Sequence, residues 1–181
     1  KIGLSGALAL LAGLEQNHGI KKVILKDNAI GSKGHGRYRF THKLYELEYF
    51  LTNLLKDRDL EEINLDHNDL DDRAAKAIGT KLGLAEKLKS LSLNGHLITD
   101  KGADAISLGL VKNQHLEKLQ LGNNQIGDAG AGGVVYPLGS EWKRPLSKVL
   151  AERLERDGIF RFMDAADNDQ LKRFAEESLR N

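Results

Sequence analysis

Leu60-x-x-Ile63-x-Leu65-x-x-Asn68-x-Leu70 is the stretch that decides the fold, because its spacing returns three more times along the chain. Two further copies begin at Leu88 and Leu116, each 28 residues after the previous one (88 − 60 and 116 − 88). An earlier copy begins at Ile20, 40 residues before Leu60, so it carries 12 extra residues (40 − 28). Self-similarity at a fixed period of roughly 20–50 residues is typical of solenoids, in which each unit packs on its neighbours.

The first half of each copy is typical of a short strand. Apolar and polar residues alternate there, and successive side chains of a strand point to opposite faces. Leu91 and Leu93 are expected to point into the solenoid, and Ser90, Ser92 and Asn94 out of it. Because all copies share one register, we predict parallel strands near residues 22–26, 62–66, 90–94 and 118–122.

A polar residue follows each predicted strand. An asparagine amide can both donate and accept hydrogen bonds, which suits the backbone groups of a turn. The sequence leaves two interpretations open for His96, a hydrogen-bonded structural histidine or part of a site. The other copies have Asn28, Asn68 and Asn124 at this position.

The second half of each copy predicts a helix. A small residue recurs near its expected start, at Gly34, Ala74, Gly102 and Gly130. Two apolar residues follow, spaced by four, and this spacing places them on one helical face. The pairs are Leu10 and Leu14, Phe50 and Leu54, Ile78 and Leu82, and Ile106 and Leu110.

This pattern resembles the leucine-rich repeat over about residues 2–138, and the asparagines resemble that family's asparagine ladder. The 28-residue period with a full helix is similar to the ribonuclease-inhibitor-like subfamily. The resemblance implies an α/β horseshoe-shaped solenoid, with parallel strands on the concave face and helices on the convex face. It also implies a binding surface more than a reaction.

The same register predicts how the array begins and ends. Ile2 and Gly6 stand 96 residues before Ile98 and Gly102, so they occupy the same positions of the repeat. We therefore expect the chain to start inside a repeat and the solenoid to be N-terminally truncated. After Leu138 the pattern stops. We therefore predict a solenoid over residues 1–138, followed by residues 139–181 as a helical C-terminal cap or a small helical module. A cap would cover the last apolar layer of the array.

The extra residues of the first full copy form an insertion at about 35–46. The stretch 32–43 carries four basic residues, two histidines and two aromatic residues, and no acidic residue. Insertions in solenoids form loops on one face, often the binding face. Arg37, Tyr38, Arg39 and Phe40 are therefore candidate contacts for an acidic partner around residues 33–43. Alternatively, the loop is solvated and its aromatic side chains pack on a helix over 44–56.

The outward strand positions form a second candidate surface, which is polar and carries no aromatic residue. The candidate contact residues on it are Lys22, Lys26, Asn64, Asp66, His67, Ser92, Asn94 and Gln120. We do not interpret Asp66, His67 and a nearby serine as a catalytic triad, because neighbouring side chains at a strand end diverge. We predict no catalytic residue, no cofactor and no metal site.

Composition limits the function classes further. Of 181 residues, 40% are hydrophobic and 29% charged, which is ordinary for a folded chain. The net charge of +1 argues against nucleic acid and membrane surfaces as partners. The sequence has no cysteine, so a reducing compartment is permitted and a disulfide framework is excluded.

The function that the sequence favours is a non-enzymatic protein-interaction scaffold of intracellular type. We expect it to act in the cytoplasm, or as an effector secreted by a bacterium into a host cytosol. Two alternatives stay open. One is a GTPase-activating regulator resembling the Ran GTPase-activating class, and the other is the substrate-recognition arm of a larger enzyme such as a ubiquitin ligase.

Overall fold

The computed structural model describes residues 1–31, 40–56, 59–113 and 115–127. Helices and strands alternate along these residues, and all four strands are three residues long. In chain order the elements are α1 (Gly3–Leu14), β1 (Lys22–Ile24), α2 (Phe40–Leu54), β2 (Glu62–Asn64), α3 (Asp72–Leu82), β3 (Ser90–Ser92), α4 (Asp100–Lys112) and β4 (Lys118–Gln120).

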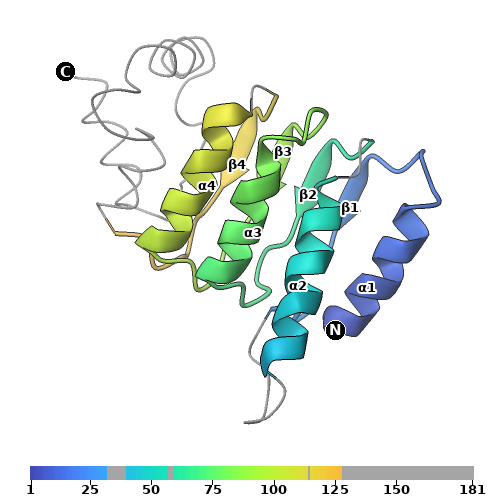
Figure 1. Ribbon diagram of the computed structural model, residues 1–181, viewed down its shortest axis with the longest axis horizontal. Coiled ribbons are helices and arrows are strands. Elements are labelled where there is room, and N and C mark those ends of the chain that lie inside the picture. The colour runs from blue at the N-terminus through green and yellow to red at the C-terminus, as the bar shows by residue number, and fades with distance from the viewer. Residues whose placement is uncertain (32–39, 57–58, 114, 128–181) are drawn as a thin grey trace.

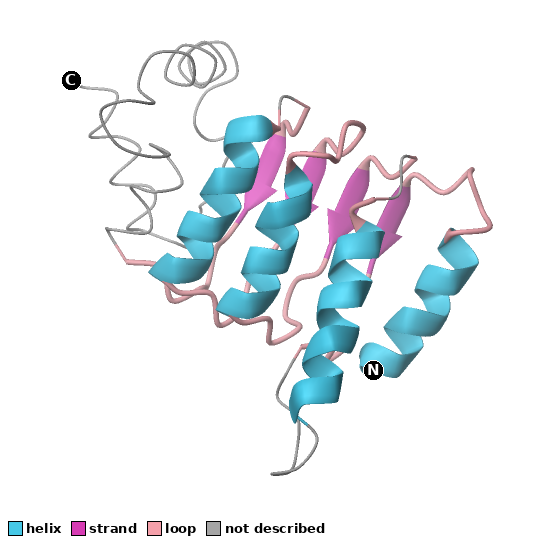
Figure 2. Ribbon diagram, in the orientation of Figure 1, coloured by secondary structure: helices cyan, strands magenta, loops and turns pink. Residues whose placement is uncertain are grey.

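The strands form one parallel sheet in the order β1-β2-β3-β4. Val23 pairs with Ile63, Ile63 with Leu91, and Leu91 with Leu119, so equivalent residues of each repeat stand side by side. The helices form a second layer along one side of this sheet (Figures 1 and 2). The predicted order, direction and register are therefore confirmed, and each strand is two residues shorter at its C-terminal end than expected.

The core lies between the sheet and the helices. Its inward strand residues are almost completely buried, with Leu91, Leu93 and Leu119 at 0% exposure and Ile63 at 1%. The predicted helical pairs of α2, α3 and α4 are buried with them. Burying a leucine side chain contributes about 1.5–3 kcal/mol to stability, so these layers hold the array together.

The prediction that Leu10 and Leu14 share a buried face is wrong for Leu10, which is 48% exposed. The buried residues of α1 are Ala7, Leu11 and Leu14. Helix α1 packs against α2, and its buried face is narrower than those of α3 and α4.

Each strand leads into a turn with a residue in the left-handed backbone region at one equivalent position. These residues are Asp27 (φ 59°), His67 (φ 54°), Gly95 (φ 68°) and Asn123 (φ 54°), and two positions later Ala29 (φ 54°) and Asp69 (φ 55°) adopt it as well. Glycine, Asn, Asp and His are the residue types that adopt this conformation most readily. The turn geometry therefore accounts for the residue types found at the equivalent position.

Aspartates at the start of two helices accept hydrogen bonds from the next repeat. Asp72 accepts hydrogen bonds from the backbone N–H of Thr99 (2.7 Å) and from its hydroxyl (2.7 Å). One repeat later, Asp100 accepts the N–H of Gly127 at 2.7 Å. The bond to Thr99 satisfies a donor at the start of α4 that has no partner within the helix, and all of these bonds join one repeat to the next.

The structure describes the insertion only in part and does not describe the predicted C-terminal segment. Helix α2 begins at Phe40 and not at Leu44 as expected, so the end of the predicted insertion lengthens this helix. Residues 32–39 and the predicted cap over 139–181 lie outside the described residues. Both the loop and the cap therefore stay predictions.

A concave polar surface as the candidate interaction site

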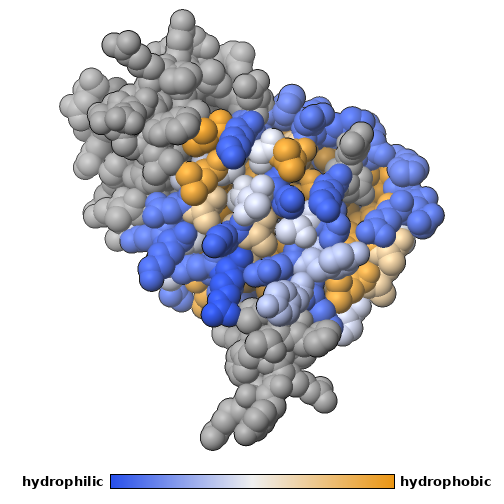
Figure 3. All heavy atoms as spheres, viewed as in Figure 1, coloured by the Kyte–Doolittle hydropathy of each residue, from blue (hydrophilic) through white to orange (hydrophobic). Residues whose placement is uncertain are grey.

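The candidate surface is the side of the sheet that faces away from the helix layer. Pairing in register places equivalent outward side chains in rows across the four strands. One row comprises Ile24, Asn64, Ser92 and Gln120. The opposite, helix-bearing side shows polar side chains with apolar ones interspersed between them (Figure 3).

The centre of this surface is a closed hydrogen-bond network around Asp66. Its Oδ1 accepts the Ser92 hydroxyl at 2.6 Å and the backbone N–H of Asn94 at 2.7 Å. Its Oδ2 accepts the side-chain amide of Asn64 at 3.1 Å. The Asn94 side chain then accepts the N–H of Gly122 at 2.7 Å, which carries the network to the fourth repeat.

These contacts bury residues that we expected to be exposed. Asp66 is only 7% exposed and Ser92 only 3%, so the expectation of an open surface is wrong at these two positions. Neighbouring parallel strands lie about 4.8 Å apart, and short polar side chains can therefore bond sideways and cover one another. The carboxylate and the hydroxyl are committed to the fold rather than offered to a partner.

The network also decides the charge of Asp66. Burial alone would raise the pKa of its carboxyl, and this is the largest influence on it. The hydrogen bonds from Ser92, Asn94 and Asn64 together outweigh burial, so the pKa is lowered and the group stays ionised. Since the Ser92 hydroxyl donates directly to this carboxylate, the pair does not have the serine–histidine–aspartate arrangement of a nucleophilic triad.

The surface is open beside β1. Lys22 and Lys26 are exposed, and Ile24 between them has 58% of its side chain exposed. Lys22 Nζ lies 2.7 Å from Glu62 Oε1 in an ion pair at the surface. Sequence reasoning left Ile24 out of the candidate contacts, although an apolar residue at an outward strand position was the signal that could have identified it.

The remaining candidates are spread over the face. His67 is exposed in its turn, whereas Asn64, Asn94 and Gln120 are half-buried. The His67 ring lies against Gly95 of the next repeat. Arg37, Tyr38 and Arg39 lie outside the described residues, and the structure describes the backbone of Phe40 but not its side chain.

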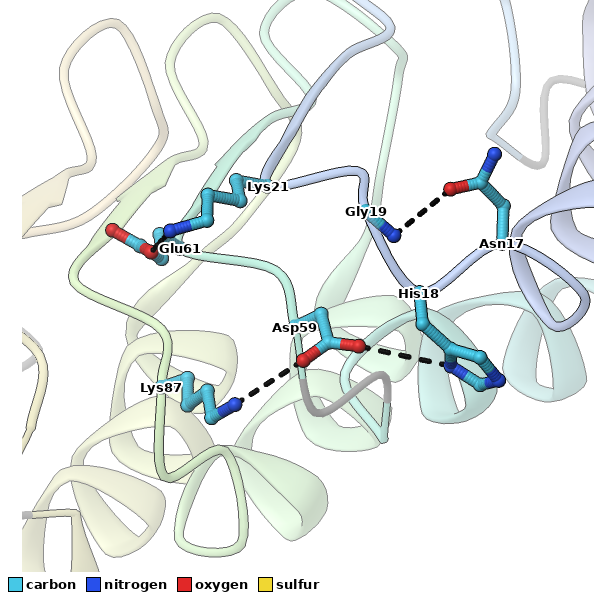
Figure 4. A network of polar contacts seen from close by, with 7 residues as sticks. All are labelled: Asn17, His18, Gly19, Lys21, Asp59, Glu61 and Lys87. Atoms are coloured by element: carbon cyan, nitrogen blue, oxygen red, sulfur yellow. Dashed lines mark hydrogen bonds and ion pairs between the residues drawn. The ribbon is translucent and has the colours of Figure 1, made fainter.

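Ion pairs join the repeats where the chain approaches the strands (Figure 4). Lys21 bonds Glu61 at 2.8 Å, and Lys87 bonds Asp59 at 3.2 Å. His18 Nδ1 lies 3.7 Å from the other Asp59 oxygen, a contact that is an ion pair only when the ring is protonated. The hydrogen bond from Lys21 lowers the pKa of Glu61, and the same bond raises the pKa of Lys21. Pairs exposed in this way add little to stability because water and salt screen them.

Among the described residues, no cluster of three or more histidines or carboxylates could hold a metal ion. In the same part of the chain, none of the helices combines the length and the apolar character needed to span a bilayer.

Comparison with known proteins agrees with this geometry. A family model described as "Leucine Rich repeat" matches residues 56–79, 85–107 and 112–134, which carry the second, third and fourth strands. Three consecutive stretches of this chain are therefore leucine-rich repeats. No curated protein matches the chain. The finer likeness to the ribonuclease-inhibitor-like subfamily stays a prediction.

Two solved structures share the fold of this leucine-rich repeat chain. One is "Leiomodin-1 Actin-Binding Site 2 (ABS2)", at 17% identity and a TM-score of 0.60, over 97% of this chain and 96% of that chain. The other is the tropomodulin C-terminal domain from Caenorhabditis elegans, at 12% identity and a TM-score of 0.61, over 83% of this chain and 95% of that chain. At such identities the likeness establishes the fold alone.

Proposed function

We propose that this chain is a protein-interaction module that binds a partner segment on the concave face beside β1. The observation that carries the proposal is Ile24, whose side chain is 58% exposed on the open side of the sheet. Burying such a side chain against a partner would remove apolar area from water, which is the main driving force of association. Polar groups in the centre of the face bond to one another, whereas Ile24 stays exposed.

The charges around Ile24 indicate the chemistry of the partner. Lys22 in β1 and Lys26 two residues after it are both exposed, and Lys22 also pairs with Glu62. A segment with an apolar side chain flanked by carboxylates would match this arrangement. We therefore propose an acidic partner segment with one apolar anchor.

Selection from a random peptide library tests this proposal. Peptides enriched on the wild-type protein should carry carboxylates around an apolar residue, and their binding should weaken at high salt. Ile24→Ser should abolish their binding. Leu84→Ser is the matched control, because Leu84 is 66% exposed but lies after α3, away from the concave face. Peptides that bind Ile24→Ser as well as wild type would contradict the proposal.

Actin is a second candidate partner. The support for it is the end-to-end likeness to the leiomodin domain whose description names an actin-binding site. Co-sedimentation with actin filaments tests it directly, with the Ile24→Ser variant showing whether the same edge is used. If the protein stays in the supernatant at micromolar actin, this candidate is excluded.

Finer proposals concern the basic segment and the setting. We propose that residues 33–43 contact an acidic part of the partner. The double substitution Arg37→Ala and Arg39→Ala should then slow association without unfolding the chain.

We propose a cytosolic setting, supported by the lack of cysteine. Delivery as a bacterial effector, GTPase activation, and substrate recognition for a ubiquitin ligase are alternatives. A GTPase-activation assay and the domain content of the full-length gene product separate them.

A further inference from the structure

A ladder of side chains links the turns of adjacent repeats. Asn68 Oδ1 accepts the backbone N–H groups of Asn28 (3.0 Å) and Ile30 (3.2 Å) from the preceding repeat. Its Nδ2 donates to the carbonyls of Leu25 (2.8 Å) and Leu65 (2.7 Å). An amide neither gains nor loses a proton between pH 4 and pH 8, so this link between β1 and β2 is insensitive to pH.

His96 occupies the same place one repeat later. Its Nδ1 accepts the N–H groups of Asn68 and Leu70, both at 3.3 Å. These two donors are the equivalents of Asn28 and Ile30. The side chain is 4% exposed, and its Nε2 has no hydrogen-bond partner among the described residues. The ring of His96 therefore accepts the two hydrogen bonds that an asparagine would accept here, but it does not donate the hydrogen bonds that an asparagine would donate.

The two bonds at Nδ1 require a neutral ring. A nitrogen that accepts hydrogen bonds must keep its lone pair, so the single proton of the neutral imidazole lies on Nε2. A second proton would have to go to Nδ1. It would then point at the N–H groups of Asn68 and Leu70, both bonds would be lost, and a positive charge would be buried.

We propose that His96 makes the β2–β3 junction acid-labile, so that protonation of Nδ1 releases the amides of Asn68 and Leu70. The junction between β1 and β2, held by Asn68, and that between β3 and β4, held by Asn124, stay closed under the same conditions. At the latter, the N–H of Ile98 donates to Asn124 Oδ1 at 3.2 Å.

The surroundings of His96 favour the neutral ring. Its pKa is lowered from 6.5 to about 4, mainly by burial and further by His67. Asp66 and Asp69 act in the opposite direction, as does the Leu65 carbonyl, although that carbonyl forms no hydrogen bond with Nε2. The ladder position of the following repeat holds the neutral Asn124.

The sign of the effect follows from this shift. A histidine in an opened junction takes up its proton near pH 6.5, whereas in the closed junction it does so only near pH 4. Between these values the open state binds more protons. Acidification therefore favours opening, and the closed state loses stability as the pH falls from about 6.5 towards 4.

Amide hydrogen exchange on the intact chain tests the proposal. The N–H groups of Ile30, Leu70 and Ile98 are equivalent in the repeat, but they donate to different residues, namely Asn68, His96 and Asn124. Between pH 8 and pH 5, the protection factor of Leu70 should fall about 30-fold relative to those of Ile30 and Ile98, given ring pKa values of 6.5 and about 4. Equal behaviour of the three amides would overturn the proposal, whether all are unaffected or all lose protection together.

Two variants complete the test. His96→Asn restores the residue found in the other repeats. The additional loss of protection of the Leu70 amide on acidification should therefore disappear. His115→Asn removes an exposed histidine by the same substitution and should leave the loss in place. If His96→Asn retains the loss, or His115→Asn removes it, the acid response does not come from His96. The wild-type exchange data decide the proposal even if His96→Asn folds poorly.

Discussion

Gly79→Ala should destabilise the protein, although alanine is the better helix former. Gly79 lies within α3, where it meets α4 closely: a Cβ built on it would overlap the backbone carbonyl of Ala105. The Cβ of an alanine at Gly109 would in turn overlap the Gly79 carbonyl. The two helices therefore touch backbone to backbone, and neither contact can be relieved by rotating a side chain.

The magnitude follows from two opposing terms. Replacing an interior helical glycine by alanine gains about 1 kcal/mol in helix propensity. Overfilling a packed contact costs about 1–3 kcal/mol, and the upper end applies here because backbone atoms must move. We expect a net loss of about 1–2 kcal/mol in the free energy of unfolding.

Gly13→Ala is the matched control. Gly13 lies in the last turn of α1 and a Cβ there would have no atom within 4 Å, so only the propensity gain of up to about 1 kcal/mol remains. Urea denaturation followed by circular dichroism should therefore shift the midpoints of the two variants in opposite directions. A Gly79→Ala midpoint at or above that of wild type would refute the close helix contact.

Three further changes test the core, the turn and the polar network. Leu91→Ala should lower the free energy of unfolding by about 2–5 kcal/mol in chemical denaturation, because Leu91 is completely buried. Ser92→Ala should lower it by about 1–3 kcal/mol, because it removes the hydroxyl bonded to Asp66. Equal midpoints for Ser92→Ala and wild type would show that this bond adds nothing. Ala29→Gly should raise the thermal midpoint by the equivalent of about 0.5–1 kcal/mol, since Ala29 has φ 54° and a left-handed alanine is strained; an unchanged midpoint would argue against this backbone conformation. The lowered pKa of Asp66 contributes stability that is present above its ordinary value of 3.8 and lost as the pH falls through the folded value. Asp66→Asn should therefore lose less stability than wild type between pH 5 and pH 2 in urea titrations, and parallel losses would contradict the assignment.

The repeat array could be predicted from the sequence because two periods specify it. Alternation by two assigned Leu91 and Leu93 to the core, and the 28-residue step aligned the strands in register. Both depend on the position of a residue within its own repeat. The same reasoning failed at Leu10, which is 48% exposed although its spacing matches that of the buried pairs in the other helices.

The candidate surface was harder to predict for a related reason. Alternation assigns a side chain to the concave side of the sheet, but it does not state whether neighbouring strands cover that side chain. Asp66 and Ser92 lie on the expected side and are buried by a bond between repeats. No pattern within one repeat encodes this contact, because the partners are 26 residues apart.

The proposed site at Ile24 differs from the Asp66 network in the same respect. Polar side chains in the middle of the concave face have neighbours on both sides and bond to them, which reduces what a partner could gain by displacing them. Ile24 of β1 is exposed, and the hydrogen bonds of the Asp66 network do not involve it. A partner that covers Ile24 would bury apolar area without breaking the Asp66 network. We therefore expect substitutions at Ile24 to change partner binding and those at Asp66 to change stability first, a separation that paired binding and denaturation measurements would reveal.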